Sequence, residues 1–150
     1  MTPRFVNSIL ESEALWAFAR VLITFMYWFA GLGFALDPSG AQAMMGGFGL
    51  QPAWLIAVLT IGVQVLGSLL IISDRLVWLG AGMLGVFTLL TIPLVHAFWT
   101  MPEPQATQAR LESEEHLTVI GGLIVVSILS HVRREWTARR TQEATAPRRA

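Results

Sequence analysis

Two histidines stand at facing ends of consecutive apolar runs, and their imidazoles are candidates for chemistry. His96 lies in the stretch IPLVHAFWTM, close to Trp99, and His116 opens the next run after an acidic string. A neutral imidazole can relay a proton, ligate a metal or hydrogen-bond a quinone carbonyl. Neither histidine has a metal-ligand spacing such as H-E-x-x-H, so we expect no metal site. The pair predicts a polar site; the alternative is that both rings lie at the membrane interface, as Trp54 and Trp99 would in an aromatic belt.

An arginine inside the first apolar run is the second candidate. Arg20, Thr24, Tyr27 and Gly31 are spaced four, three and four residues apart, which places them on one face of a helix. An arginine at such a position usually faces protein or water and is a functional hypothesis by default. In the alternative interpretation Arg20 extends to the lipid headgroups and Tyr27 only packs.

Gln64 lies in the middle of the second apolar run. A side-chain amide at that depth is expected to hydrogen-bond a neighbouring helix, so an interhelical bond is the favoured interpretation and ligand binding the alternative. The spelling GAGMLG at 80–85 matches a dinucleotide loop, but no strand precedes it, and we reject that match. We instead expect the glycines of the second and third runs to allow close helix approach; these are Gly62, Gly67, Gly80, Gly82 and Gly85.

The elements that position these residues are four long apolar runs. The chain has 150 residues, of which 54% are hydrophobic and 13% charged, whereas a soluble domain carries about 25% charged residues. A helix needs about 20 apolar residues to cross a bilayer, and the runs show no alternation of period two. The sequence therefore predicts an all-α integral membrane four-helix bundle, with helices at about 14–36, 54–73, 76–98 and 116–132.

The distribution of charge predicts the orientation. All ten basic residues are arginine, and the segments predicted to lie outside, 37–53 and 99–115, hold only Arg110 among them. We therefore expect both termini in the cytoplasm. Segment 37–53 is expected to be a short helix or re-entrant piece, and 99–115 a polar loop. Residues 1–136 would form the membrane domain, and 137–150 a disordered Arg-rich tail.

Composition also excludes classes of function. Cys is absent, which excludes disulfides, thiol catalysis and Cys-ligated metal centres. The formal net charge is zero, so we expect no nucleic-acid partner.

Several short stretches resemble the DoxX-like family of small four-helix inner-membrane proteins. They are AR at 19–20, AGLG at 30–33, QVLGSLLII in the second run, HAFW at the end of the third and IGGLIVV in the fourth. The resemblance implies a membrane subunit tied to respiratory or oxidative-stress chemistry. One branch of the family is similar to the small subunit of a thiosulfate:quinone oxidoreductase, and another appears with superoxide dismutase and a sulfurtransferase. Family-typical polar groups would fall at Arg20, Gln64, His96 and the Glu115–His116 pair. Gln64 departs from the acidic residue common there, and Glu115–His116 from a Lys–Asn-like pair.

From this resemblance we predict an accessory subunit of a quinone-linked redox or oxidative-stress (thiosulfate/sulfur) system in a bacterial inner membrane. Quinone is the candidate cofactor, and membrane or cytosolic redox proteins, or a second copy of the chain, are the candidate partners beside the lipid bilayer. The alternative is a non-enzymatic structural or partner-binding membrane protein, and whether the chain is catalytic stays open. The candidate ligand-binding residues are Arg20, Tyr27, Gln64, His96, Trp99 and His116.

Overall fold

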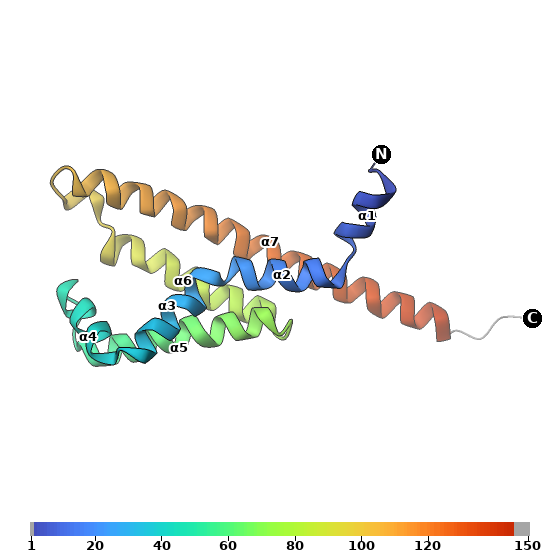
Figure 1. Ribbon diagram of the computed structural model, residues 1–150, viewed down its shortest axis with the longest axis horizontal. Helices are drawn as coiled ribbons and strands as arrows, with labels where there is room; N and C mark the ends of the chain where they lie inside the picture. The colour runs from blue at the N-terminus through green and yellow to red at the C-terminus, as the bar shows by residue number, and fades with distance from the viewer. Residues whose placement is uncertain (1, 146–150) are drawn as a thin grey trace, which may run out of the picture.

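The computed structural model describes residues 2–145, and helices account for nearly all of this range, which contains no strand. The elements in chain order are α1 (Arg4–Leu10), α2 (Glu13–Ile23), α3 (Phe25–Leu36), α4 (Pro38–Gly47), α5 (Ala53–Ile72), α6 (Val77–Val95), the 3₁₀ turn η1 (Phe98–Thr100) and α7 (Gln105–Thr145). Figure 1 shows the long helices running back and forth along one axis. The all-α class is therefore confirmed.

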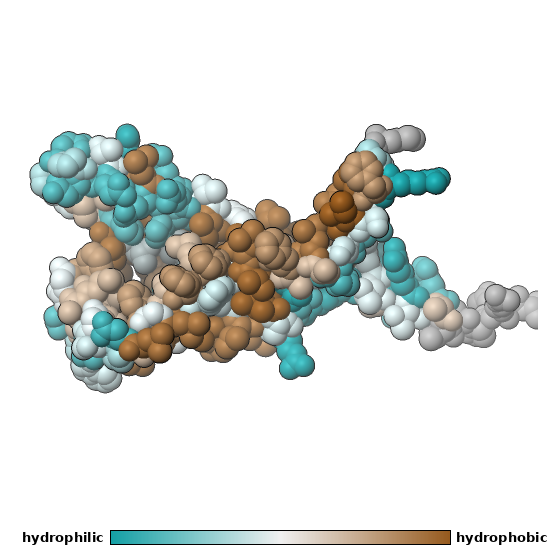
Figure 2. Space-filling model, in the orientation of Figure 1, coloured by the Kyte–Doolittle hydropathy of each residue, from teal (hydrophilic) through white to brown (hydrophobic). Residues whose placement is uncertain are grey.

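Several of these helices are long and apolar enough to cross a membrane. Among the described residues, α5, α6 with η1, and α7 each meet that condition, and α2 with α3 forms a fourth span if the bent pair crosses as one. Figure 2 shows a wide hydrophobic surface across the middle of the molecule, with hydrophilic residues gathered toward its ends. Helix α6 packs against both α5 and α7, and α3 packs against α5.

The first predicted helix is divided at Thr24, where α2 and α3 meet with a bend of 53°. The Thr24 hydroxyl donates to the backbone carbonyls of Arg20, at 2.8 Å, and Val21, at 3.2 Å. Hydroxyl bonds to the preceding turn are a known cause of helix bending. Arg20, Thr24, Tyr27 and Gly31 are nevertheless all buried, so the shared face predicted from their spacing is confirmed.

Segment 37–53 contains a short helix, as predicted. Pro38 occupies the first turn of α4, and the Asp37 side chain accepts the backbone N–H of Gly40 at 2.9 Å. This bond, together with the Ser39 hydroxyl, holds the pKa of Asp37 below its usual range. Ala41 of α4 is buried and packs with the first turns of α5.

Helices α5 and α6 form the tight antiparallel hairpin that the two-residue link predicts. Asp74 and Leu76, which flank Arg75, have positive φ values of 56° and 51°. A Cβ added at Gly80 would lie 2.6 Å from the carbonyl oxygen of Gly67, so these two glycines permit the close approach of the helices. The expectation that glycines allow close helix approach is wrong for three others, where an added Cβ would meet nothing within 4 Å; these are Gly62, Gly82 and Gly85.

The last helix is much longer than the predicted span at 116–132. Helix α7 begins at Gln105, inside the segment expected to be a polar loop, and continues through Thr145. Its terminal turns extend past the other long helices in Figure 1. The helix therefore also includes 137–145, which we expected to be disordered; 146–150 lie outside the described residues. Extending an existing helix needs no new nucleus, and the Ala, Arg, Gln and Glu of this tail are good helix formers.

Candidate functional site

The predicted site residues fall into three separate groups along the bundle. Arg20 belongs to a cluster at the end where α5 turns into α6, which we call the arginine cluster: Trp16, Arg20, Asp74, Ser130 and Arg134. Tyr27 and Gln64 lie in the middle, and His96 and His116 lie at the opposite end. The structure does not bring all of these residues together.

In the arginine cluster, the Arg20 guanidinium is bound by the end of α5. Its Nη1 donates to the carbonyl oxygen of Ile72 at 2.8 Å and to that of Ile71 at 3.3 Å. The same nitrogen lies 3.7 Å from Oδ1 of Asp74. Carbonyls at a helix C-terminus carry partial negative charge and attract a cation. The side chain is only 10% exposed, so it contacts protein and does not extend outward as the alternative interpretation supposed.

Asp74 connects three helices through its carboxylate. Oδ2 accepts the indole N–H of Trp16 at 3.2 Å, and Oδ1 accepts the hydroxyl of Ser130 at 2.9 Å. Arg134 donates to its backbone carbonyl and lies 3.7 Å from Oδ1. These contacts tie α2 and α7 to the α5–α6 hairpin. Asp74 was not among the residues predicted for a site; its place at the end of an apolar run, with an arginine in the first run, was the available signal.

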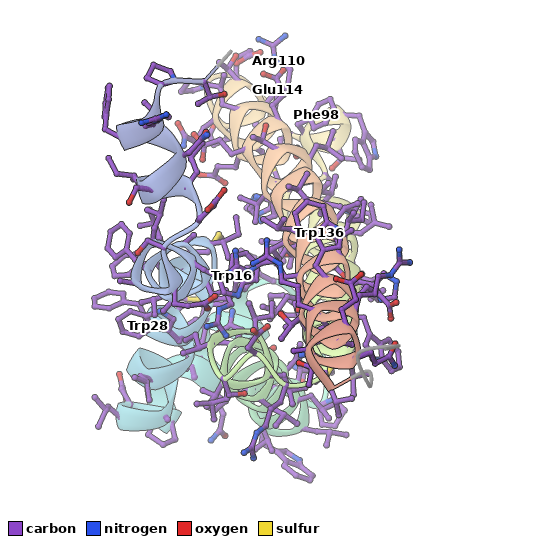
Figure 3. All side chains as sticks on the ribbon, turned by 90° about the vertical axis from the view of Figure 1, so that its right-hand side faces the viewer. Trp16, Trp28, Phe98, Arg110, Glu114 and Trp136 are labelled. Atoms are coloured by element: carbon purple, nitrogen blue, oxygen red, sulfur yellow. The ribbon has the colours of Figure 1, made fainter. Side chains whose placement is uncertain are left out.

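The Trp16 ring packs against two arginine side chains at this end of the bundle. The Cζ atoms of Arg20 and Arg133 lie 5.3 Å and 5.4 Å from its ring centroid. Arg133 also forms an ion pair with Glu13. Figure 3 looks onto this end of the molecule, with Trp16 between α2 and α7 and Trp28 toward the outer edge.

In the middle of the bundle, Tyr27 and Thr88 share a hydrogen bond through their hydroxyls, and Thr88 also donates to the Leu84 carbonyl at 2.7 Å. Gln64 and Ser68 are buried one turn apart on α5. Within residues 2–145, neither the Gln64 Oε1 nor the Ser68 Oγ has a hydrogen-bond partner. The predicted interhelical bond of Gln64 is therefore not made by its oxygen.

The opposite end brings the two predicted histidines together with Glu112, a trio we call the histidine cluster: His96, Glu112 and His116. The ring centroids of His96 and His116 are 4.9 Å apart, with an interplanar angle of 65°. Nδ1 of His96 lies 2.8 Å from Oε2 of Glu112, and Nδ1 of His116 lies 2.6 Å from the Glu112 carbonyl oxygen. The two histidines lie at the same end of the bundle, as their places in consecutive runs predicted, and the structure adds the contact between their rings. Glu112 was not predicted as part of the site, although it belongs to the acidic string before His116; its spacing four residues before His116 was the missed signal.

These contacts fix which nitrogen of each histidine is free. A carbonyl oxygen and a carboxylate only accept hydrogen bonds, so both Nδ1 atoms carry hydrogen. In the neutral rings, each Nε2 then presents a lone pair that can accept a proton or ligate a metal. The arrangement of an imidazole held by a carboxylate is also the usual second shell of a metal-binding histidine. However, no group of three or more His, Asp or Glu side chains suited to a metal occurs within the described part of the chain.

Trp99 does not join the histidine cluster through any contact of its ring with the imidazoles. Its side chain is 59% exposed, and its ring packs edge-on against Phe98 with centroids 5.0 Å apart. Figure 3 shows Phe98 near the first turns of α7, where Arg110 and Glu114 lie. Trp99 therefore has the exposed position expected of a ring at a membrane interface.

Comparison with known proteins adds one finding. The family model described as DoxX matches residues 15–97, which is more than half of the chain and covers α2 through α6. Neither the comparison with curated proteins nor that with solved structures gives a match. Glu112 and His116 lie beyond the matched residues, so two of the three residues of the histidine cluster are outside the region that carries the family resemblance. With its apolar helices and this match, the chain is a membrane protein that belongs to the DoxX family.

Proposed function

We propose that this protein is an accessory subunit of a quinone-linked redox or oxidative-stress system, and that the histidine cluster is its quinone site. The observation that carries the proposal is the shared partner of the two imidazoles. Glu112 contacts Nδ1 of His96 through its carboxylate and Nδ1 of His116 through its backbone carbonyl. Both Nε2 atoms are left free. Hydrogen-bond acceptors of this kind fit the hydroxyl groups of a quinol.

The residues of the cluster suit the transfer of a proton. A quinone bound there would supply a couple of two electrons and two protons. His96 Nε2 can accept a proton from a hydroxyl group, and the Glu112 carboxylate at Nδ1 stabilises the resulting imidazolium. The His96 side chain is 16% exposed and that of Glu112 is 36% exposed. Glu112, the more exposed of the two side chains, can therefore pass a proton between His96 and water.

The absence of Cys from the sequence supports an accessory role. The chain has no Cys, so a Cys-ligated iron–sulfur centre that exchanges electrons with this site would belong to a partner. We accordingly propose membrane or cytosolic redox proteins as partners, with sulfur compounds such as thiosulfate as the substrate class of the assembly.

Binding of decylubiquinol, the reduced form that carries the two hydroxyl groups, to the purified protein in nanodiscs tests this proposal. We expect His96→Ala and Glu112→Gln to weaken binding at least tenfold, because each removes an acceptor or the carboxylate that orients it. Glu114→Gln is the matched control, since this glutamate also lies on α7 but pairs with Arg110 outside the cluster, and it should bind as the wild type does. Equal binding by the wild type and His96→Ala, or no binding at all, would overturn the proposal.

We also propose that the membrane is a bacterial inner membrane and that both termini face the cytoplasm. The bias of arginine supports this orientation, and α1 and the end of α7 lie on the same side of the molecule in Figure 1. Because the chain has no Cys, single-cysteine variants can be labelled without background. In intact cells a membrane-impermeant maleimide should label Gln105→Cys and spare Ala138→Cys, both of which replace exposed residues. The reverse pattern would refute the orientation.

One observation favours the alternative, a non-enzymatic partner-binding protein. The end of α7 carries the exposed Trp136, at 63%, and extends past the rest of the bundle. A partner that binds this helix should be lost when residues 137–150 are removed, while quinone binding at the other end should not change. An unaltered set of co-purified proteins would count against a docking role for this segment.

A further inference from the structure

A groove between α6 and α7 adjoins the arginine cluster, with which it shares Ser130 and Arg134. It consists of two adjoining hollows of about 450 Å³ and about 360 Å³, and both are lined by Trp78, Ser127 and Ile128. The larger hollow is apolar along its length, with Leu89 and Leu117 among its lining residues. The smaller one includes polar side chains.

The groove exists because of the glycines that do not serve helix packing. On α6 its lining includes Trp78, Gly82, Gly85 and Leu89, which are spaced four, three and four residues apart and so share one face. A Cβ added at Gly82 or Gly85 would meet nothing within 4 Å. Gly82 and Gly85 therefore leave open space, the floor of the groove, between the larger side chains of Trp78 and Leu89.

The facing stripe of α7 changes from apolar to polar along its length, in the order Leu117, Ile120, Ile124, Ser127, His131 and Arg134. From Leu117 to Ile128 the helix rises about 16 Å at 1.5 Å per residue. This is close to half of the ~30 Å hydrocarbon thickness of a bilayer. The apolar part of the groove thus has the length of one leaflet, and the polar side chains follow toward the end of the bundle that holds the arginine cluster.

The polar end has hydrogen-bonding capacity to spare and carries positive charge. Among residues 2–145, the Ser127 hydroxyl and the His131 ring have no hydrogen-bond partner in the fold, and both line the groove from adjacent turns. The Arg134 side chain is 49% exposed, so only part of its five N–H groups is taken up by Asp74. In the part of the chain that the structure describes, no carboxylate lines the groove. Asp74, at 35% exposed, and the ion-paired Arg133 are the neighbouring charged groups.

We propose that this groove binds an anionic phospholipid, with an acyl chain over Gly82 and Gly85 and the phosphate at His131 and Arg134. Basic pockets between membrane helices bind anionic headgroups in this way, and a guanidinium matches the geometry of a phosphate. Charge disfavours a second copy of the chain as the occupant. A symmetric, parallel pair of grooves would bring Arg134 of each chain toward its equivalent.

Native mass spectrometry of the protein, released from nanodiscs of equal parts phosphatidylglycerol and phosphatidylcholine, tests the proposal. We expect bound phosphatidylglycerol to exceed phosphatidylcholine about fivefold, the ratio that corresponds to one basic residue near a membrane surface. His131→Gln and Arg134→Gln should lower the ratio. Gly85→Leu should displace the lipid altogether, because the new side chain fills the floor of the groove. Arg140→Gln, on the exposed end of α7, is the matched control and should retain the wild-type ratio.

His131→Gln keeps the test valid if Arg134→Gln fails to fold, because His131 makes no contact that holds the helices together; circular dichroism checks the fold of each variant. Equal retention of the two lipids by the wild type would overturn the proposal. So would a Gly85→Leu variant that binds lipid as the wild type does. A dimer that is lost in Gly85→Leu, without any lipid preference, would assign the groove to a second copy and would also overturn it.

Discussion

Arg20 should hold α2 against α5 mainly through backbone carbonyls and only weakly through its ion pair with Asp74. Three variants separate these contributions: Arg20→Gln, Asp74→Asn and the double substitution. Arg20→Gln removes the 2.8 Å bond to Ile72, the 3.3 Å bond to Ile71 and the ion pair together. Asp74→Asn removes the charge of the ion pair but leaves the carbonyls in place.

The distances decide which contribution is larger. A hydrogen bond from a charged donor contributes about 1.5–3 kcal/mol, so the Arg20 carbonyl contacts should contribute about 2–3 kcal/mol together. The ion pair is longer, at 3.7 Å, and the Asp74 side chain is 35% exposed. Pairs of this kind contribute about 0.2–1 kcal/mol. Arg20→Gln should therefore cost about 2–3 kcal/mol, while the coupling between Arg20 and Asp74 should stay below about 1 kcal/mol.

The free energy of unfolding in detergent, followed by tryptophan fluorescence, measures all four corners of this cycle. Glu13→Gln with Arg133→Gln is the matched control, because that ion pair also lies beside Trp16 but its Glu13 side chain is 82% exposed. Its coupling should be about 0–1 kcal/mol. If the Arg20–Asp74 coupling equals the whole cost of Arg20→Gln, the ion pair holds the helix and our reasoning from the carbonyls is wrong.

Two further predictions use the same measurement of unfolding. Gly80→Ala should lower the free energy of unfolding by about 1–3 kcal/mol, because its Cβ would lie 2.6 Å from the Gly67 carbonyl. Gly82→Ala should be neutral or stabilising. Equal effects of the two substitutions would contradict the assigned contact. Gln64→Met should stabilise the protein by up to about 1–3 kcal/mol by removing a buried oxygen that lacks a partner. Thr88→Val, which breaks the bond to Tyr27, should instead destabilise it by about 1 kcal/mol, and destabilisation by Gln64→Met would show that the amide oxygen is bound.

The sequence predicts well where periodicity and connection length determine the structure. Helix α5 spans Ala53–Ile72 against a predicted 54–73. The face shared by Arg20 and Tyr27 follows from helical spacing alone. His96 and His116 could be placed together because they end and begin two runs joined by one segment, and antiparallel helices bring such ends to the same side.

Features set by side-chain bonds and by partners distant in sequence could not be predicted in this way. The bend at Thr24 arises from a hydroxyl bonding to the preceding turn, and no proline or glycine marks it. The role of Asp74 depends on Trp16 and Ser130, which are 58 and 56 residues away. Gly80 and Gly82 look alike in the sequence, yet only the first faces α5 closely. Which face of a helix meets a neighbour is decided by packing, and glycine spacing does not reveal it.

The two ends of the bundle differ in how much hydrogen-bonding capacity the fold consumes, and this difference separates structural from functional polar groups. Arg20 is the residue that membrane energetics first marks as functional, yet its contacts with Ile72 and Asp74 lie within the chain. A histidine ring costs less free energy at a membrane edge than an arginine costs inside the membrane. Glu112, however, binds one nitrogen of each ring and leaves the other nitrogen free. A side chain whose contacts are completed by the fold explains stability. One that is oriented by the fold and still has an open acceptor is available to a ligand, so the histidine cluster is the stronger candidate site.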